Sequence, residues 1–316
     1  MLAHIAKTVS DTVQKTTRAR ACERLKPSGT LALDKQTGAV RALGVVDERL
    51  LGACDDGGLR CWSTTSGALA SQARAHAGAV TAMVTSKDGT RVTSASERGD
   101  AATRDARTGV VTMELENGVD AVALWCLGML TSGELVGGDD VGRIFVWEDG
   151  ERFPIWRFAS TAESAPMPGK AKRLKPSEGP PDRVHAVSGW VHRSTGKEFV
   201  VSGNGHGILS LWTVRVGKPV AEFGPDDGGH RGAIHTVCDN EGVIVTGGAD
   251  GRVLAWYVNE EGQLLGPPEE LSVHGHHTGA VLCAASIRPG FVCTGGVDGR
   301  ALVWDIKARA VLFECP

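Results

Sequence analysis

A short motif returns at regular intervals along the chain, and it constrains the fold more than any other feature. Two late copies read Val-Thr-Gly-Gly-Ala-Asp-Gly-Arg-Val-Leu-Ala-Trp at 245–256 and Cys-Thr-Gly-Gly-Val-Asp-Gly-Arg-Ala-Leu-Val-Trp at 293–304. The remaining copies end at Trp62, Arg104, Trp147 and Trp212. Successive copies end 42, 43, 65, 44 and 48 residues apart. An interval of this size is typical of repeat folds in which each copy forms one supersecondary unit.

Each copy predicts four short β-strands. A β-rich run follows a Gly-Ala-Val or Gly-Ala-Ile entry, as at residues 231–234 and 278–281, and a second run ends at the Gly-Gly pair. The Asp-Gly dipeptide is the usual signal for a hairpin turn. The third run ends in Trp, and a fourth precedes the next entry. Four strands in each interval correspond to one blade of a β-propeller, and the 42 glycines of the chain agree with so many tight turns.

With this combined pattern, residues 18–316 resemble the WD40-repeat family, whose members are all-β propellers. Only one literal Trp-Asp pair is present, Trp304-Asp305. In that family a His, a Ser or Thr, an Asp and the Trp form a hydrogen-bonded tetrad within a blade. Such a tetrad supplies partners for an indole N–H and an imidazole that would otherwise be buried alone. The resemblance implies two complete structural tetrads: His230, Thr246, Asp250 and Trp256, and His277, Thr294, Asp298 and Trp304.

The other four copies each lack at least one member of the tetrad, so we expect regular blades at the back of the chain and degenerate ones at the front. The first has Asp56 and Trp62 with Gln36 in the His place, the second has His76 and Ser94 without Asp or Trp, the third has little beyond Trp147, and the fourth has Ser202 and Trp212 with His206 in the Asp place.

The number of blades depends on how the ring closes. Six entries are visible, and residues 18–34 align with the third and fourth strands of a further blade. Residues 1–17 are too few for two more full-length strands with their loops. We predict a single propeller over 18–316 with seven blades, the irregular closing blade coming from the N-terminus, and a six-bladed ring as the alternative. An open ring exposes strand edges, and an incomplete blade can accept a strand from a partner.

Two segments are expected to lie outside the regular blades. Residues 1–17 are an N-terminal extension, either a short amphipathic helix or a tail. Residues 159–183 are a loop insert between two blades, with five of the thirteen prolines. Its basic residues are Lys170, Lys172, Arg173 and Lys175. This cluster is either a solvated loop or a docking segment for an acidic protein or for RNA phosphates.

Composition excludes several classes of protein. The 34 Lys and Arg against 37 Asp and Glu give a net charge of −3, which excludes a surface built entirely for nucleic acid. No apolar run is long enough to cross a bilayer, so we expect no membrane insertion. The eight cysteines form no CxxC pair and indicate free thiols in a reducing compartment. We therefore expect an intracellular protein, in the cytoplasm first, with the nucleus, a cilium or an organelle as alternatives.

The sequence offers no set of residues for catalysis or for a cofactor. His274-Gly-His-His277 suggests a metal ligand, but no Cys or carboxylate follows at zinc spacing. No Gly-x-Ser-x-Gly motif is present, and the His and Asp of the tetrads recur in two copies, which favours structure over catalysis. We expect a non-enzymatic scaffold for protein–protein interactions within a larger assembly, with no cofactor, metal or small-molecule substrate. The alternative is a ribonucleoprotein component that contacts RNA through the basic insert and the N-terminus.

Overall fold

The computed structural model describes residues 38–116, 122–154, 156–159, 182–214, 219–271 and 276–315, together with residue 33. Within these residues the chain forms 24 β-strands and one turn of 3-10 helix, η1 (Pro225–Asp227). The all-β class predicted from the repeats is therefore confirmed.

The strands form six sheets of four antiparallel strands each, numbered here as blades 1 to 6 in chain order. Blade 1 contains β1 (Val40–Val46), β2 (Arg49–Cys54), β3 (Gly58–Ser63) and β4 (Leu69–Arg74). Blade 2 contains β5 (Val80–Thr85), β6 (Arg91–Ser96), β7 (Ala101–Asp105) and β8 (Val111–Leu115). Blade 3 contains β9 (Leu124–Met129), β10 (Leu135–Asp139), β11 (Arg143–Trp147) and β12 (Trp156–Ala159).

Blade 4 contains β13 (Val184–Val191), β14 (Glu198–Asn204), β15 (Leu209–Thr213) and β16 (Pro219–Phe223). Blade 5 contains β17 (Ile234–Asn240), β18 (Val243–Gly248), β19 (Val253–Trp256) and β20 (Glu269–Glu270). Blade 6 contains β21 (Val281–Arg288), β22 (Phe291–Gly296), β23 (Ala301–Asp305) and β24 (Ala310–Cys315).

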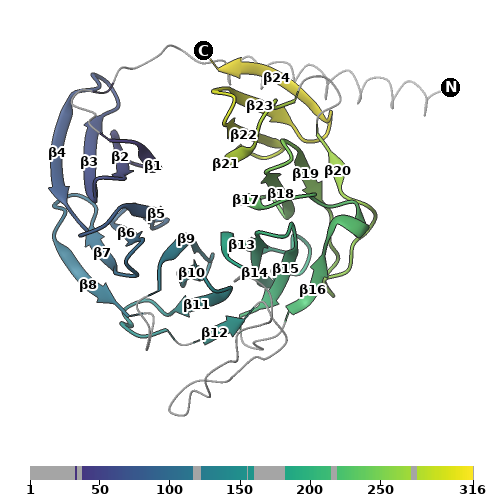
Figure 1. Cartoon of the computed structure of the whole chain (residues 1–316), viewed down its shortest axis with the longest axis horizontal. Coiled ribbons are helices and arrows are strands. Elements are labelled where there is room, and N and C mark those ends of the chain that lie inside the picture. The colour runs from purple at the N-terminus through teal and green to yellow at the C-terminus, as the bar shows by residue number, and fades with distance from the viewer. Residues whose placement is uncertain are drawn as a thin grey trace, which may run out of the picture.

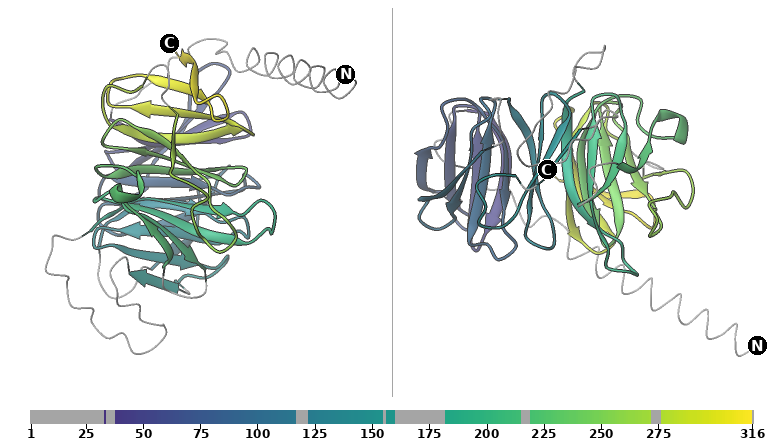
Figure 2. Two further views of the ribbon diagram at one scale, coloured as in Figure 1. Left: turned by 90° about the vertical axis from the view of Figure 1, so that its right-hand side faces the viewer. Right: turned by 90° about the horizontal axis from the view of Figure 1, so that it is seen from below.

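The blades stand around a ring, with the first strand of each blade nearest the centre and the fourth on the rim (Figure 1). Figure 2 shows the ring from the side, with the strands running between its two faces. In blades 1 to 5 the fourth strand is followed in the sequence by the first strand of the next blade. Six blades are present among the described residues, so the six-bladed alternative matches and the preferred count of seven is not confirmed. Apart from residue 33, the predicted closing segment 18–34 lies outside the described residues.

The core lies between blades. Five buried apolar clusters each combine residues of two consecutive blades, from blades 1 and 2 through blades 5 and 6. A tryptophan at or next to the end of the third strand is fully or almost fully buried in five of the six blades: Trp62, Trp147, Trp212, Trp256 and Trp304. Among the described residues, no cluster of this kind joins blade 6 to blade 1.

The insert predicted at 159–183 falls between β12, which ends at Ala159, and β13, which begins at Val184. It therefore connects the rim of blade 3 to the inner strand of blade 4. Residues 160–181, which include Lys170, Lys172, Arg173 and Lys175, lie outside the described residues, as does the N-terminal extension 1–17.

Candidate functional site

Blade 5 brings its four tetrad residues together as one hydrogen-bonded chain. The Trp256 indole N–H donates to Thr246 Oγ1 at 2.8 Å. Thr246 Oγ1 lies 2.7 Å from His230 Nε2, and His230 Nδ1 lies 2.9 Å from Asp250 Oδ1. Because the hydroxyl accepts from the indole, its own proton points to Nε2, which leaves the imidazole proton on Nδ1 to donate to the carboxylate. The network thus selects one neutral tautomer of the buried His230.

Blade 6 repeats this arrangement nearly atom for atom. Trp304 Nε1 donates to Thr294 Oγ1 at 2.7 Å, Thr294 Oγ1 lies 2.8 Å from His277 Nε2, and His277 Nδ1 lies 3.0 Å from Asp298 Oδ1. Burial alone would raise the pKa of Asp298, but hydrogen bonds from His277 and from the Thr278 and Arg300 backbone N–H groups outweigh it and lower the pKa to about 2. The carboxylate therefore stays ionised across the neutral range and holds the histidine in place.

Blade 2 builds the same chain with an arginine in the Trp place. Arg104 Nη1 donates to Ser94 Oγ at 2.9 Å, and Ser94 Oγ lies 2.7 Å from His76 Nε2. Arg104 Nη2 also donates to the Ala75 carbonyl at 2.9 Å. Burial lowers the pKa of His76, in agreement with a neutral imidazole that accepts at Nε2.

The expectation that blade 2 lacks an acidic member is wrong. His76 Nδ1 is hydrogen-bonded to Asp100. Asp250 precedes its turn glycine, Gly251, whereas Asp100 follows Gly99, so the carboxylate comes from a different position in the turn. A repeat alignment compares positions and cannot see this exchange; the signal available in the sequence was an Asp two places late.

Blade 4 reverses the acid and the base. The Trp212 indole donates to Ser202 Oγ at 2.9 Å, as in the regular blades. However, His206 stands on the turn where blades 5 and 6 have their Asp, and its Nδ1 lies 2.7 Å from Asp182 Oδ1. Asp182 enters just before β13 and also accepts from the Asn204 side chain. The turn thus keeps a hydrogen bond between an Asp and a His, with the two residue types exchanged.

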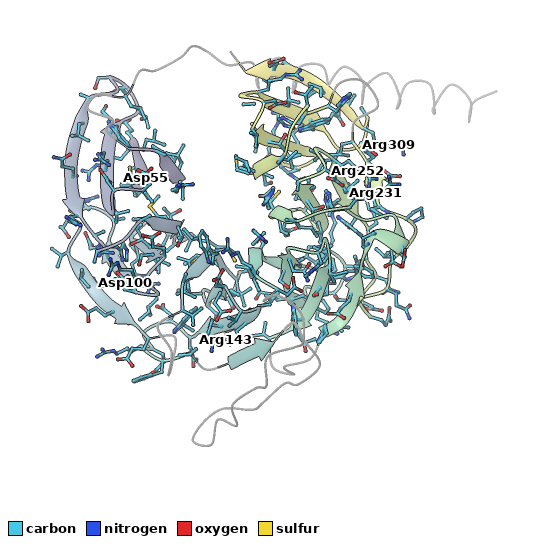
Figure 3. All side chains as sticks on the ribbon, viewed as in Figure 1. Asp55, Asp100, Arg143, Arg231, Arg252 and Arg309 are labelled. Carbon is cyan, nitrogen blue, oxygen red and sulfur yellow. The ribbon has the colours of Figure 1, made fainter. Side chains whose placement is uncertain are left out.

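Blades 1 and 3 replace the histidine pair with arginine–aspartate pairs inside one hairpin. Arg60 is paired with Asp56 in blade 1, and Arg143 Nε donates to Asp139 at 2.5 Å in blade 3. The Trp147 indole donates to the Glu116 carbonyl at 3.1 Å. Figure 3 places Asp100 on blade 2 and Arg143 on the neighbouring blade 3. Each described blade thus holds its turn between the second and third strands with a polar pair.

The position between blade 6 and blade 1 is open in the described part of the chain. We call it the seam, and it is bordered by β21 and β1 (Figure 1). In Figure 3 none of the described side chains spans it. The β1 side of the seam carries Leu43 and Val45, which are 58% and 62% exposed, and the β21 side carries Leu282 and Ile287, which are 52% and 42% exposed.

In the five other blades the residue at the place of Leu43 is buried or half-buried. Each of the six first strands has a bulge or shift in register in its pairing with the second strand. Beyond this shift, Leu43 of blade 1 pairs with Gly52. Met83 of blade 2 and Val237 of blade 5 occupy the same place, since they pair with Ser94 and Thr246. Met83 and Val237 are only 9% exposed. The exposure of Leu43 therefore results from an absent neighbour rather than from its place in the blade.

The comparisons with known proteins agree with the blades. A family model described as "WD domain, G-beta repeat" matches residues 268–305, which include the third-strand hairpin of blade 6 and its tryptophan. The chain is a WD40-repeat β-propeller. It is similar in fold to a solved structure of the computationally designed Ika8 protein, with 21% identity, a TM-score of 0.61 and coverage of 90% of this chain and 89% of that chain. No curated protein matches the chain.

Two further findings bear on what the WD40 propeller can do. The described residues contain no group of three or more His, Cys, Asp or Glu side chains that could hold a metal ion, and His274 lies outside them. Within the described ranges, no helix has the length and apolar character needed to cross a membrane. The exposed apolar side chains at the seam are the feature that was not predicted from the sequence.

Proposed function

We propose that this WD40 propeller is a non-enzymatic scaffold for protein–protein interactions and a subunit of a larger intracellular assembly. The observation that carries the proposal is the seam, where Leu43, Val45, Leu282 and Ile287 are exposed together on two facing strands. Apolar side chains gathered in this way mark an interaction site or a liability to aggregation. A propeller is a suitable support for such a site because its blades hold the two strands in fixed positions.

The polar residues support a structural rather than a catalytic role. His230 and His277 are buried, and each already has a hydroxyl on one ring nitrogen and a carboxylate on the other. A general base needs a free nitrogen within reach of a substrate. The proposal therefore includes no reaction, substrate or cofactor.

We also propose that the predicted closing segment lies at the seam. In the described blades the fourth strand leads to the first strand of the next blade, as β4 leads to β5. A blade preceding blade 1 would therefore have its fourth strand just before β1 in the sequence. Ser28-Gly29-Thr-Leu-Ala32 also matches Ser66-Gly67-Ala-Leu-Ala70, which forms the turn and start of β4. We propose that residues 18–34 supply the third and fourth strands of a seventh blade.

The basic insert is proposed as a second contact. Lys170, Lys172, Arg173 and Lys175 fall within six consecutive residues of the sequence, and this concentration of positive charge suits an acidic protein surface. Binding of RNA phosphates is the alternative, and it requires a steep loss of affinity with rising salt.

Affinity purification of the tagged protein from its native cells tests the proposal. Lysates are divided and treated with nuclease or left untreated. A reproducible set of protein partners that survives nuclease is the expected result. Recovery of the protein alone contradicts the scaffold, and recovery of partners that nuclease removes favours the ribonucleoprotein alternative.

A matched variant locates the second contact. Residues 161–180 are replaced by a Gly-Ser linker of equal length, which retains Asp182 with its bonds to blade 4 and Arg183 with its ion pair to Asp140. The control keeps the insert and changes only its four basic residues to Ser. Loss of the same partner from both variants assigns the contact to the charges.

A further inference from the structure

We infer that β4, the outer strand of blade 1, pairs edge to edge with β4 of a second copy of this chain, so that two propellers form a symmetric dimer. The inference goes beyond the proposed scaffold function and does not depend on it. It follows from the exposure of β4, from the residue type at one place in the strand and from the direction of its backbone groups.

The outer edge of β4 has no partner among the described residues, because β4 is the last strand of its four-stranded sheet and lies on the rim (Figure 1). Its six residues read Leu-Ala-Ser-Gln-Ala-Arg, and all of them except Leu69 are exposed. In the described part of the chain, the side chains of Ser71 and Gln72 make no hydrogen bond or ion pair. An exposed strand edge is a template for pairing with another chain unless charges, prolines or a covering segment prevent it.

The other five blades carry a charged residue at one fixed place in the outer strand. This place lies opposite the third-strand residue that stands two positions before the Trp, or before Arg104 in blade 2. In blades 2 to 6 it is occupied by Glu114, Arg157, Glu222, Glu270 and Glu314. In blade 1 it is occupied by Gln72, opposite Arg60. Among the described outer strands, only β4 therefore lacks a charge at this place.

The backbone groups of Gln72 and Arg74 point away from β3. The Ala75 N–H donates to the carbonyl of its opposite residue, Gly57, at 2.9 Å. Along an antiparallel ladder, opposite residues that bond to each other alternate with residues whose N–H and C=O groups face outward, and Arg74 and Gln72 belong to the outward set. A register shift leaves Ala70 without an opposite residue in β3, but blades 2, 4 and 6 have the same shift, so it does not distinguish β4.

A two-fold axis at Gln72 gives β4 and its copy a register without repulsion. Outward residues must face outward residues, since only these can bond across the new pair. Gln72 then faces Gln72 of the copy, where the two carboxamides can donate to and accept from each other, and Arg74 faces Ala70. The same axis in blades 2, 4, 5 and 6 would oppose two glutamates, which destabilises a strand pair. The dimer therefore forms through blade 1 alone, and the two-fold axis closes it at two copies.

β4 is also packed less tightly on its own ring than other outer strands. Ala73 is exposed, whereas Leu115 and Phe223, at the same place in β8 and β16, are only 8% and 7% exposed. The two-fold axis sets Ser71 opposite Ala73 of the copy, and both side chains are small enough for the two strands to approach to the normal spacing of a sheet. Pairing thus covers a strand that its own ring leaves exposed.

Sedimentation velocity of the full-length recombinant protein tests the dimer. The paired segments are short, so we expect a weak dimer with a dissociation constant of about 10–500 µM and no larger species. Hydrogen exchange at the two ends of this concentration range locates the contact by mass spectrometry. The peptide that contains β4 should gain protection at high concentration, and the peptide that contains β16 should not. A monomer throughout, or a dimer that leaves the β4 amides unprotected, overturns the inference.

Two variants of Gln72 break the pairing in different ways. Gln72→Pro removes the outward N–H at the two-fold axis but no bond to β3, and such a position on an edge strand tolerates proline. We expect it to raise the dissociation constant at least about tenfold. Gln72→Glu introduces the residue that four other blades have at this place, and it should raise the constant about threefold at low salt and less at high salt.

Ala68→Glu is the matched control, because it adds the same charge at an exposed residue just before β4 and should leave the dissociation constant within about twofold. Urea unfolding shows whether each variant keeps its fold. If Gln72→Pro does not fold, Gln72→Glu still decides, and a constant that it does not change overturns the pairing. Recovery of partners from cells is a separate measurement, so a monomer overturns this inference and leaves the scaffold proposal standing.

Discussion

Blade 2 and blade 5 both bury a histidine behind the turn of their central hairpin, but they complete its hydrogen bonds with different residues. In blade 5 the donor to the central hydroxyl is the Trp256 indole, and in blade 2 it is the Arg104 guanidinium. The histidine and hydroxyl distances agree within 0.1 Å: His230 Nε2 to Thr246 Oγ1 and His76 Nε2 to Ser94 Oγ are both 2.7 Å.

This comparison shows what the blade requires. The hydroxyl oxygen accepts one hydrogen bond and donates its own proton to the histidine. Any buried donor that can reach this oxygen completes its hydrogen bonds. The position of the acidic partner can also change, since Asp250 and Asp100 bond to Nδ1 of their histidines from different positions in the turn. The pattern of satisfied hydrogen bonds is kept while residue types and places change.

The largest effect should come from removing the donor in each blade. Trp256 is fully buried in the cluster between blades 4 and 5 and stacks on Phe223 with ring centroids 5.9 Å apart. Trp256→Ala should lower the free energy of unfolding by about 3–5 kcal/mol, because it leaves a large cavity. Arg104→Ala should lower it by only about 1–3 kcal/mol, the effect of lost hydrogen bonds. Urea unfolding at neutral pH measures both, and equal losses would contradict the view that only the indole is an apolar anchor.

A smaller effect should come from the acidic members, and it should depend on pH. Burial would raise the pKa of Asp250, but hydrogen bonds from His230 and the Arg231 N–H lower it to about 2, below the value of about 3.9 expected in the unfolded chain. The ionised carboxylate therefore stabilises the fold above about pH 4, and this contribution is lost as the pH falls toward 2.

Asp250→Asn should thus lower the free energy of unfolding by about 2 kcal/mol at pH 6, and the difference from the unmodified protein should shrink toward pH 2. Asp100→Asn should do less, because its carboxylate is 49% exposed against 13% for Asp250, and solvent screens its interaction with the histidine. Urea titrations at pH 6 and pH 3 test the pair. A difference that does not change with pH would show that the charge of Asp250 is unimportant.

The blades could be predicted from the sequence because their signals are local. The motif with Asp, Gly and Trp in fixed order predicts one hairpin and its buried anchor, and the structure places the tetrad residues of blades 5 and 6 side by side. Asp100 was missed because a carboxylate can reach the same nitrogen from another place on the turn. The insert and residues 1–17 carry no apolar period of a blade, and their predictions stay untested.

The seam could not be predicted because it depends on what stands beside a strand. Leu43 and Met83 occupy equivalent places, and nothing in either repeat shows that only the second has a neighbour on that side. The count of seven blades followed from the same local alignment of residues 18–34. Closure of a ring is a property of all its blades together, and no single repeat contains it.

The smallest effect should come from converting blade 2 into a regular blade. Arg104→Trp places an indole where blade 5 has Trp256, with its N–H able to donate to Ser94. The substitution removes the Arg104 guanidinium, whose charged form is disfavoured by burial. It also removes the hydrogen bond from Arg104 to the Ala75 carbonyl. Replacement of a buried charged group by a well-packed apolar one is often neutral or stabilising.

We therefore expect Arg104→Trp to change the free energy of unfolding by no more than about 1 kcal/mol, with stabilisation the favoured sign. Arg104→Leu is the control, because it fills part of the space without a donor to Ser94 and should be less stable than Arg104→Trp by about 1 kcal/mol. Urea unfolding of the three proteins in parallel gives the order. If Arg104→Trp proves as unstable as Arg104→Leu, the bond to the Ala75 carbonyl matters more than the donor to Ser94, and blade 2 has an arrangement of its own rather than a variant of the one in blade 5.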